Sequence, residues 1–189
     1  MAGMAIDLGS IAKGYAADRI LLTLEQNKVE AALINLGGNI LLLGNKPNGQ
    51  PWRLGLRSGV EGDVSMELVL RSPLAISTAG INERYFEQDG KKYHHILSPF
   101  TGYPVENDLA SVTVLNHGSS MTTDALSTIL FILGVEEGLA LAAAEEVEAI
   151  FVRKDFGVLT SSGVGLTADS DIQIVHFAPN YQLISQEGE

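Results

Sequence analysis

The chain is organised around residues 121–128, which read Met-Thr-Thr-Asp-Ala-Leu-Ser-Thr. They lead into the apolar run 129–133, so the pattern predicts a helix with a local start signal. Thr122 and Thr123 are residue types that cap helix N-termini, and Asp124 is then expected in the first turn.

Asp124 and Thr128 are four residues apart, and a helix therefore places their side chains on one face. A carboxylate and a hydroxyl are hard oxygen ligands of the kind that Mg²⁺ accepts, with water and phosphate completing its octahedron. A helix N-terminus also favours a phosphate at the same point. Taken alone, the pair has a simpler structural interpretation: the acid complements the helix dipole, and the hydroxyl bonds to the backbone.

The composition of the chain limits the classes of protein to which it can belong. The 189 residues carry a formal net charge of −11 and contain no cysteine. The length suits one domain or part of a larger one, and the lack of cysteine excludes disulfides, thiolate metal sites and cysteine nucleophiles. The negative charge argues against nucleic-acid binding, and it means that an anionic ligand needs a cation or helix N-termini at its site. No run of 18 or more apolar residues predicts a membrane span.

A second helix is predicted over residues 10–24, directly after Gly9. Gly14 within its first turns is costly for a helix unless another segment packs close to it. Lys13 on its own reads as a solvated surface lysine. The residues expected to form the apolar stripe of this helix are Ile11, Tyr15, Ile20, Leu21 and Leu24.

The rest of the chain alternates strand patterns with turns, and a third helix is predicted over 135–144 after Gly134. Strands in hairpin-like succession, with three helices grouped among them, predict an α+β fold of antiparallel sheets with packed helices. Residues 172–177 are expected to complete the sheet, and 179–189 are expected to form a frayed tail. The predicted strands are 31–43, 52–57, 66–72, 74–78, 83–87, 92–97, 109–115, 147–153, 158–162 and 172–177.

Two further local features bear on possible binding sites. Gly37-Gly38-Asn39 interrupts the strand 31–43, which fits a bulge or a close approach of backbone to a ligand, and fits a plain hairpin turn equally well. His94 and His95 fall on opposite faces of a strand, so the two are not expected to bind one metal ion.

Five segments together resemble the motifs of one family, in the same order and over most of the chain. They are 7–16 (DLGSIAKGYA), 35–39 (NLGGN), 77–86 (STAG followed by ERYF), 95–104 (HILSPFTGYP) and 123–128 (TDALST). One such motif would be weak, whereas five in order make a strong resemblance. The family is that of the ApbE-type FAD:protein FMN transferases.

The resemblance implies a T-fold-like α+β arrangement and an Mg²⁺-dependent enzyme that takes FAD as its substrate. Such enzymes cleave FAD between its phosphates, pass FMN to a Thr or Ser hydroxyl of a partner flavoprotein and release AMP. Some members hydrolyse FAD to FMN and AMP instead. Many relatives are lipoproteins or periplasmic proteins, so an extracytoplasmic location is expected.

Site residues follow by position within the motifs. The implied Mg²⁺ ligands are the side chains of Asp124 and Thr128 and the main-chain carbonyl of Ser10. His95 is implied as the catalytic histidine at the acceptor hydroxyl. The residues implied near FAD are Ser10, Lys13, Gly37, Gly38, Thr78 and Asp124.

The chain also departs from the family pattern. Ser98 stands where the family usually carries Asp, Phe100 where it usually carries Arg or Lys, and Ala79 where it carries Ser. An acid at position 98 could orient His95 or lie near the metal, so its loss is expected to weaken catalysis while sparing binding. A protein that binds or hydrolyses FAD with impaired transfer therefore stands as the alternative function.

The family's N-terminal part, which supplies some of the flavin and adenine pocket, has no counterpart before Asp7. Residues 1–189 are accordingly expected to form a single flavin transferase-like domain, equivalent to the C-terminal portion of the family's fold.

Overall fold

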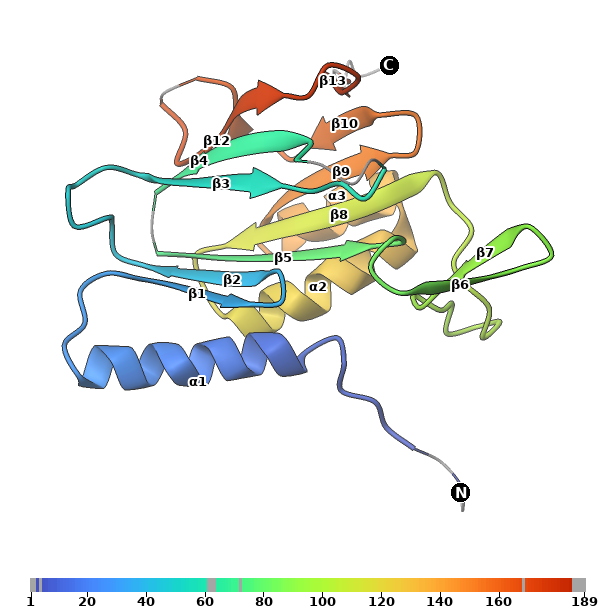
Figure 1. Ribbon diagram of the computed structural model, residues 1–189, viewed down its shortest axis with the longest axis horizontal. Coiled ribbons are helices and arrows are strands. Elements are labelled where there is room, and N and C mark those ends of the chain that lie inside the picture. The colour runs from blue at the N-terminus through green and yellow to red at the C-terminus, as the bar shows by residue number, and fades with distance from the viewer. Residues whose placement is uncertain (1–2, 4, 61–63, 72, 168, 185–189) are drawn as a thin grey trace.

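The computed structural model describes residues 3, 5–60, 64–71, 73–167 and 169–184. A central sheet is covered by three helices on one face and by a smaller sheet on the other, with a separate hairpin at one end (Figure 1). The helices are α1 (Ala12–Gln26), α2 (Ser120–Leu133) and α3 (Val135–Ala144). The hairpin consists of β6 (Tyr85–Gln88) and β7 (Lys91–His94).

The central sheet has seven strands and the smaller sheet has four. Neighbouring strands are antiparallel except in the pairs β10–β13 and β11–β12, so the expected α+β class is confirmed. In sheet order, the seven strands are β1 (Ala32–Leu36), β2 (Asn39–Leu43), β5 (Leu74–Gly80), β8 (Leu109–Asn116), β9 (Glu148–Arg153), β10 (Gly157–Thr160) and β13 (Gln182–Leu183). The four strands are β11 (Val164–Gly165), β12 (Ile172–Phe177), β4 (Met66–Leu70) and β3 (Trp52–Leu56).

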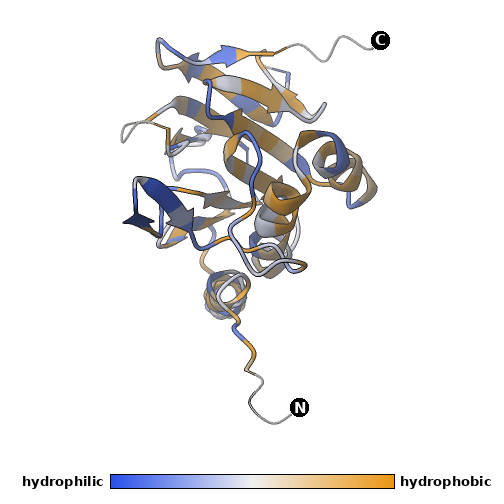
Figure 2. Cartoon of the chain, turned by 90° about the vertical axis from the view of Figure 1, so that its right-hand side faces the viewer, coloured by the Kyte–Doolittle hydropathy of each residue, from blue (hydrophilic) through white to orange (hydrophobic). Residues whose placement is uncertain are grey.

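Three apolar clusters join these layers. One fills the space between the two sheets, a second lies between the central sheet and helices α2 and α3, and a third packs α1 on β1 and β2. In Figure 2 the strands are mostly hydrophobic and many of the connecting loops are hydrophilic, as expected for strands buried between layers.

Strand β5 runs through the middle of the molecule and contributes side chains to both faces of the central sheet. Ile76 belongs to the core between the two sheets, whereas Ala75 and Ala79 belong to the cores under the helices. Because side chains alternate along a strand, Ser77 faces the helices and Thr78 faces the second sheet. The two neighbours therefore take part in different sites.

The start predicted for the helix that contains residues 121–133 was wrong. Helix α2 begins at Ser120, and its N-cap is Ser119, whose Oγ accepts a hydrogen bond of 3.3 Å from the Thr122 N–H. Asp124 is consequently the fifth helical residue, and the first turn contains no acid. Ser119 is as good a cap as a threonine, so the local sequence offered several starts and tertiary packing selected the earliest.

The stripe predicted for α1 was wrong at two positions, because Tyr15 is 56% exposed and Ile20 is 38% exposed. The helix instead buries Gly14 and Ala17. A small-residue face lets another helix approach closely, which a stripe of large side chains does not.

The paired glycines form the hairpin turn between β1 and β2, with φ of 60° at Gly37 and 92° at Gly38. Two positive φ values are what a tight two-residue hairpin requires, so the hairpin alternative is confirmed. Gly134, with φ of 84°, separates α2 from α3 as predicted.

Two expectations for the C-terminal region were wrong. Strand β12 pairs with β4 in the smaller sheet and does not complete the central one. Residues 179–184 are anchored, since β13 pairs with β10 and the buried Tyr181 hydroxyl lies 2.5 Å from Ser58 Oγ. The last part of the predicted tail, 185–189, lies outside the described residues, as does Ser72 at the end of the predicted strand 66–72.

Candidate functional site

Helices α1 and α2 meet at their N-terminal ends, at a contact that only glycine permits. A Cβ on Gly14 would lie 2.3 Å from the Ser120 carbonyl oxygen and 2.6 Å from the Met121 Cα. Both are backbone atoms that no side-chain rotation can move away. The glycine that looked costly in the sequence is therefore the residue that brings two distant helix starts together.

Asp124 lies at this contact and is 4% exposed. Its Oδ2 accepts a hydrogen bond of 3.0 Å from the Gly14 N–H, and its Oδ1 accepts one of 2.9 Å from Ser77 Oγ. The carboxylate thus satisfies an N-terminal N–H of α1, whose own N-cap Ile11 provides no side-chain bond. Asp124 has no ion-pair partner among the described residues.

Asp18, which the sequence analysis did not single out, makes the reciprocal contact. Its carboxylate accepts hydrogen bonds from Ser119 Oγ at 2.6 Å, from the Ser120 N–H at 2.7 Å and from the Met121 N–H at 3.1 Å. An acid on each helix therefore caps the N-terminus of the other. Asp18 lies four residues after Gly14, on the same face of α1, and this spacing was the available signal.

The ligands expected for a cation fit this junction chemically. The Gly14 N–H donates to Asp124 and not back to Ser10, so the Ser10 carbonyl accepts no bond from the first helical turn. Thr128 is half-buried one turn beyond Asp124, and its hydroxyl, unlike that of Ser127, makes no bond to the helix backbone. Carboxylate, hydroxyl and carbonyl oxygens are the donors that Mg²⁺ prefers.

Among the described residues there is no group of three or more His, Asp and Glu side chains that could hold a metal by themselves. A cation at Asp124 would therefore depend on hydroxyl, carbonyl, water and substrate oxygens for its remaining ligands. Lys13 is the second residue of α1, is half-buried and has no ion pair in the part of the chain that the structure describes.

The residues expected near FAD fall into two groups. Ser10, Lys13 and Asp124 belong to the helix junction, whereas Gly38 and Thr78 line a cavity of about 770 Å³ between the two sheets. Gly37 lies beside Gly38 in the exposed hairpin turn, outside the cavity lining. The structure does not gather all of these residues in one pocket.

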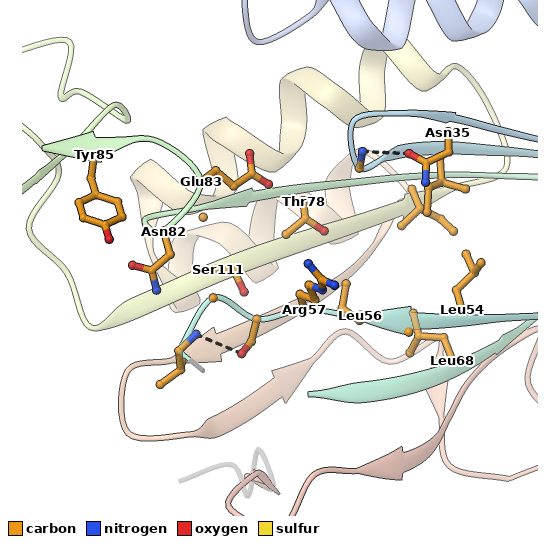
Figure 3. A pocket seen from close by; sticks show the side chains of 18 residues that line it. Asn35, Leu54, Leu56, Arg57, Leu68, Thr78, Asn82, Glu83, Tyr85 and Ser111 are labelled. Atoms are coloured by element: carbon orange, nitrogen blue, oxygen red, sulfur yellow. Dashed lines mark hydrogen bonds between the residues drawn. The ribbon is translucent and has the colours of Figure 1, made fainter. Parts of the chain in front are cut away.

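The cavity has an apolar floor and a polar end. Leu54, Leu56 and Ile76 belong to its floor. In Figure 3 the side chain of Arg57, at the end of β3, lies between the sheets opposite Thr78 and Ser111. Ser111 Oγ is buried and has no hydrogen-bond partner within the described residues, so it is free to bond to a ligand. Arg57 and Ser111 carried no motif signal and were missed from the sequence.

The hairpin of β6 and β7 lies at one end of the molecule (Figure 1). His95 directly follows β7 and is exposed. Its backbone N–H and its ring Nδ1 both lie 3.1 Å from the Arg84 carbonyl oxygen. A carbonyl only accepts, so Nδ1 donates to it, and the tautomer with its proton on Nδ1 has Nε2 as the bare nitrogen. No described hydrogen bond links His95 to the helix junction.

His94 points the other way, as strand alternation predicted, and is 9% exposed. Its Nε2 lies 3.1 Å from the Val105 carbonyl oxygen, and its ring meets Phe131 edge-on at 6.0 Å. Burial lowers the pKa of His94 below its usual 6.5. This residue has a structural role in the core.

The loop after His95 is held by its own backbone. Ser98 N–H donates to the Tyr103 carbonyl at 2.8 Å, and Ser98 Oγ accepts from the Phe100 N–H at 3.3 Å. Phe100 is 93% exposed. The Arg84 carbonyl orients His95 without an acid at position 98. The expected weakening of catalysis by Ser98 and Phe100 stays a prediction.

Comparison with known proteins places this arrangement in a family. Residues 1–151 match the model of the ApbE family. The chain belongs to that family. A crystal structure of the ApbE protein from Thermotoga maritima superposes with a TM-score of 0.77 at 34% identity, covering 85% of this chain and 52% of that one. The flavin transferase ApbE from Vibrio cholerae gives a TM-score of 0.72 at 35% identity, covering 83% and 50%. The expected ApbE arrangement is thereby confirmed.

Curated relatives of this ApbE-family chain bear the name FAD:protein FMN transferase. The protein from Klebsiella pneumoniae (strain 342) is 44% identical over 178 residues, which cover 92% of this chain and 54% of that protein. The one from Treponema pallidum (strain Nichols) is 38% identical over 174 residues, covering 86% and 48%. The chain spans about half the length of these relatives. None of the described helices is long and apolar enough to cross a bilayer.

Proposed function

We propose that the chain binds FAD together with Mg²⁺ at the α1–α2 junction and transfers FMN to a Thr or Ser hydroxyl of a flavoprotein, releasing AMP. The observation that carries this proposal is the carboxylate of Asp124. It is 4% exposed and accepts only two hydrogen bonds from neutral groups, with no cationic side chain paired to it in the described structure.

A buried carboxylate in such a setting is costly unless a cation joins it. Each carboxylate oxygen has two lone-pair positions, so the bonds from Gly14 and Ser77 leave room for a metal ligand on Asp124. The bonds also fix the orientation of the carboxylate, as outer hydrogen bonds commonly do for metal ligands.

The same junction suits the diphosphate of FAD. The N-terminus of α1 presents a partial positive charge, and Lys13 in its first turn adds a full one. In an acidic chain these groups, together with a divalent cation, would balance an anionic substrate. When bound, Mg²⁺ would supply electrostatic stabilisation of the charge that develops on the phosphate oxygens.

His95 would act on the acceptor. Its Nε2 would take the proton of the acceptor hydroxyl while that oxygen forms a bond to the phosphorus of the FMN half of FAD. The bond from this phosphorus to the bridging oxygen then breaks, and AMP leaves with the electron pair. The Arg84 carbonyl holds the required tautomer, with Nδ1 protonated and Nε2 free.

The cavity between the sheets would receive one ring of FAD. Its apolar floor of leucine and isoleucine side chains suits the faces of an aromatic ring, and the free Ser111 hydroxyl suits a ring-edge polar atom. Gly38 and Thr78 would then contact FAD away from its diphosphate.

The test is incubation of the chain with FAD, MgCl₂ and an acceptor flavoprotein domain, followed by in-gel flavin fluorescence and AMP quantification. Covalent flavin on the acceptor with an equal amount of AMP supports the proposal. AMP and free FMN without acceptor labelling would instead indicate FAD hydrolysis, and retention of intact FAD by the chain would indicate binding alone. Asp124→Ala should abolish turnover, whereas Glu136→Ala, which removes an exposed acid from α3, should not.

A further inference from the structure

Asp18 is the acid on α1 that contacts the start of α2 at the helix junction. It is half-buried and receives three hydrogen bonds, all from consecutive residues at the start of α2: Ser119, Ser120 and Met121. Two of the donors are backbone N–H groups, which fix the position of the helix itself and not of a mobile side chain.

These bonds determine where Asp124 stands. Asp18 and Gly14 are one turn apart on α1, and Ser120 and Asp124 are one turn apart on α2. Asp18 ties one turn of α2 to α1, and the bond from Gly14 N–H to Asp124 Oδ2 ties the next. Hydrogen bonds at two positions one turn apart fix both the translation and the rotation of α2 relative to α1.

We propose that Asp18 is a positioning residue for the cation site: by holding the N-terminus of α2 on α1, it sets the distance between the Asp124 carboxylate and the Ser10 carbonyl. This inference rests on the proposed function, since it takes the divalent cation to bind at Asp124. Asp18 itself faces α2 backbone donors and is not a ligand.

Removal of Asp18 leaves other ties at the junction. Ser119 still caps α2 through the Thr122 N–H, and Ser120 Oγ still donates to the buried Asn39 Oδ1 at 2.8 Å. Variants at position 18 are therefore expected to fold, with α2 less tightly fixed. The measurable consequence is weaker binding of a cation by a folded protein.

The experiment uses Mn²⁺ as an EPR-visible substitute for Mg²⁺ and measures its dissociation constant with the purified chain in the presence of FAD. Asp18→Ala should weaken Mn²⁺ binding about tenfold to a hundredfold, the usual effect of losing an outer partner of a metal site. Asp18→Asn, which keeps one acceptor oxygen, should recover part of that loss. Glu25→Gln, which removes an exposed charge from the same helix, should stay within twofold of the wild type.

The outcomes separate the inference from the proposed function. Failure of the wild type to bind Mn²⁺, or unchanged binding in Asp124→Ala, would refute the cation site itself. Loss of binding in Asp124→Ala together with wild-type affinity in folded Asp18→Asn and Asp18→Ala would overturn the positioning role alone. If Asp18→Ala does not fold, as judged by circular dichroism, Asp18→Asn decides, and Ser119→Ala, which removes one donor to Asp18, should weaken Mn²⁺ binding in the same direction.

Discussion

The backbone N–H of Gly14 donates a hydrogen bond of 3.0 Å to Oδ2 of Asp124, a residue 110 positions further along the chain. This contact places a buried carboxylate at the start of a helix that has no side-chain cap of its own. It also leaves the Ser10 carbonyl without a bond from the first turn of α1, so both oxygens would be available to the proposed cation.

Gly14→Ala should destabilise the fold by about 1–3 kcal/mol, the usual cost of forcing extra volume into a tight contact. The new Cβ would overlap the Ser120 carbonyl and Met121 backbone atoms, so α1 and α2 must separate. Alanine is otherwise the better helix former by about 1 kcal/mol, so helix propensity acts in the opposite direction. Urea denaturation measures the change, and a variant as stable as the wild type would show that the helices do not touch here.

Removal of the divalent cation should affect wild type and Asp124→Asn differently. In EDTA, Asp124→Asn should be at least as stable as the wild type, because it removes a buried charge that has no cationic partner in the described chain. Addition of Mg²⁺ with FAD at a hundredfold excess over Kd should stabilise the wild type by about 2.7 kcal/mol, and it should leave the variant's Tm unchanged. Thermal denaturation with and without Mg²⁺ is the measurement, and equal shifts in both proteins would contradict a site at Asp124.

Ser77→Ala should weaken Mg²⁺ binding by about tenfold, since it removes the hydroxyl that holds Oδ1 of Asp124 at 2.9 Å. Thr78→Val, the adjacent change on the opposite face of β5, should leave the affinity for Mg²⁺ measured without FAD unaltered, because Thr78 Oγ1 bonds to Thr113 Oγ1 and not to Asp124. Isothermal titration calorimetry compares the two. Similar losses in both variants would mean that β5 acts only through general stability.

His95→Gln should reduce FMN transfer by about 10²–10⁴-fold, the usual contribution of a general base, with FAD and Mg²⁺ affinities retained. His117→Gln is the matched control, because His117 is also exposed and its Nδ1 also lies near a backbone carbonyl, that of Pro73 at 2.7 Å. Single-turnover labelling of an acceptor domain gives both rates. Equal activities would remove His95 from the reaction.

His94 should make the fold less stable in acid. Its folded-state pKa is lowered by burial, so the unfolded chain binds a proton at a higher pH than the folded one. Stability is therefore fully present above the unfolded value of about 6.5, is lost as the pH falls below it, and levels off below the folded-state pKa. Nδ1 of His94 has no partner in the described structure, so a proton placed there would be buried unpaired.

Denaturation curves of the wild type and His94→Gln between pH 7.5 and 5.5 test this dependence. The variant should show a flatter profile than the wild type. An unchanged slope in His94→Gln would assign the acid sensitivity to other groups.

Much of the fold was readable from local patterns. The Asp89-Gly90 turn, with φ of 53° and 75°, joins β6 and β7 in the gap between the predicted strands 83–87 and 92–97, and Gly134 ends α2. Such features depend on the φ values that glycine allows, and this preference is a property of the residue itself. The sequence could not predict which strands belong to which of the two sheets. The alternation of apolar and polar residues in β12 fits either sheet, and only the pairing of β12 with β4 decides.

The sequence by itself determined the α+β class, the family motifs and the residue types at the helix starts, because period, turn chemistry and residue identity are local. Only the tertiary structure decided that Asp124 caps α1 while Asp18 caps α2, and that Ser77 and Thr78 serve different sites. The physical reason is that a carboxylate bonds to whichever unpaired N–H groups lie nearest. Which N–H groups lie nearest depends on how closely the two helices approach, here at Gly14, and not on spacing along the chain.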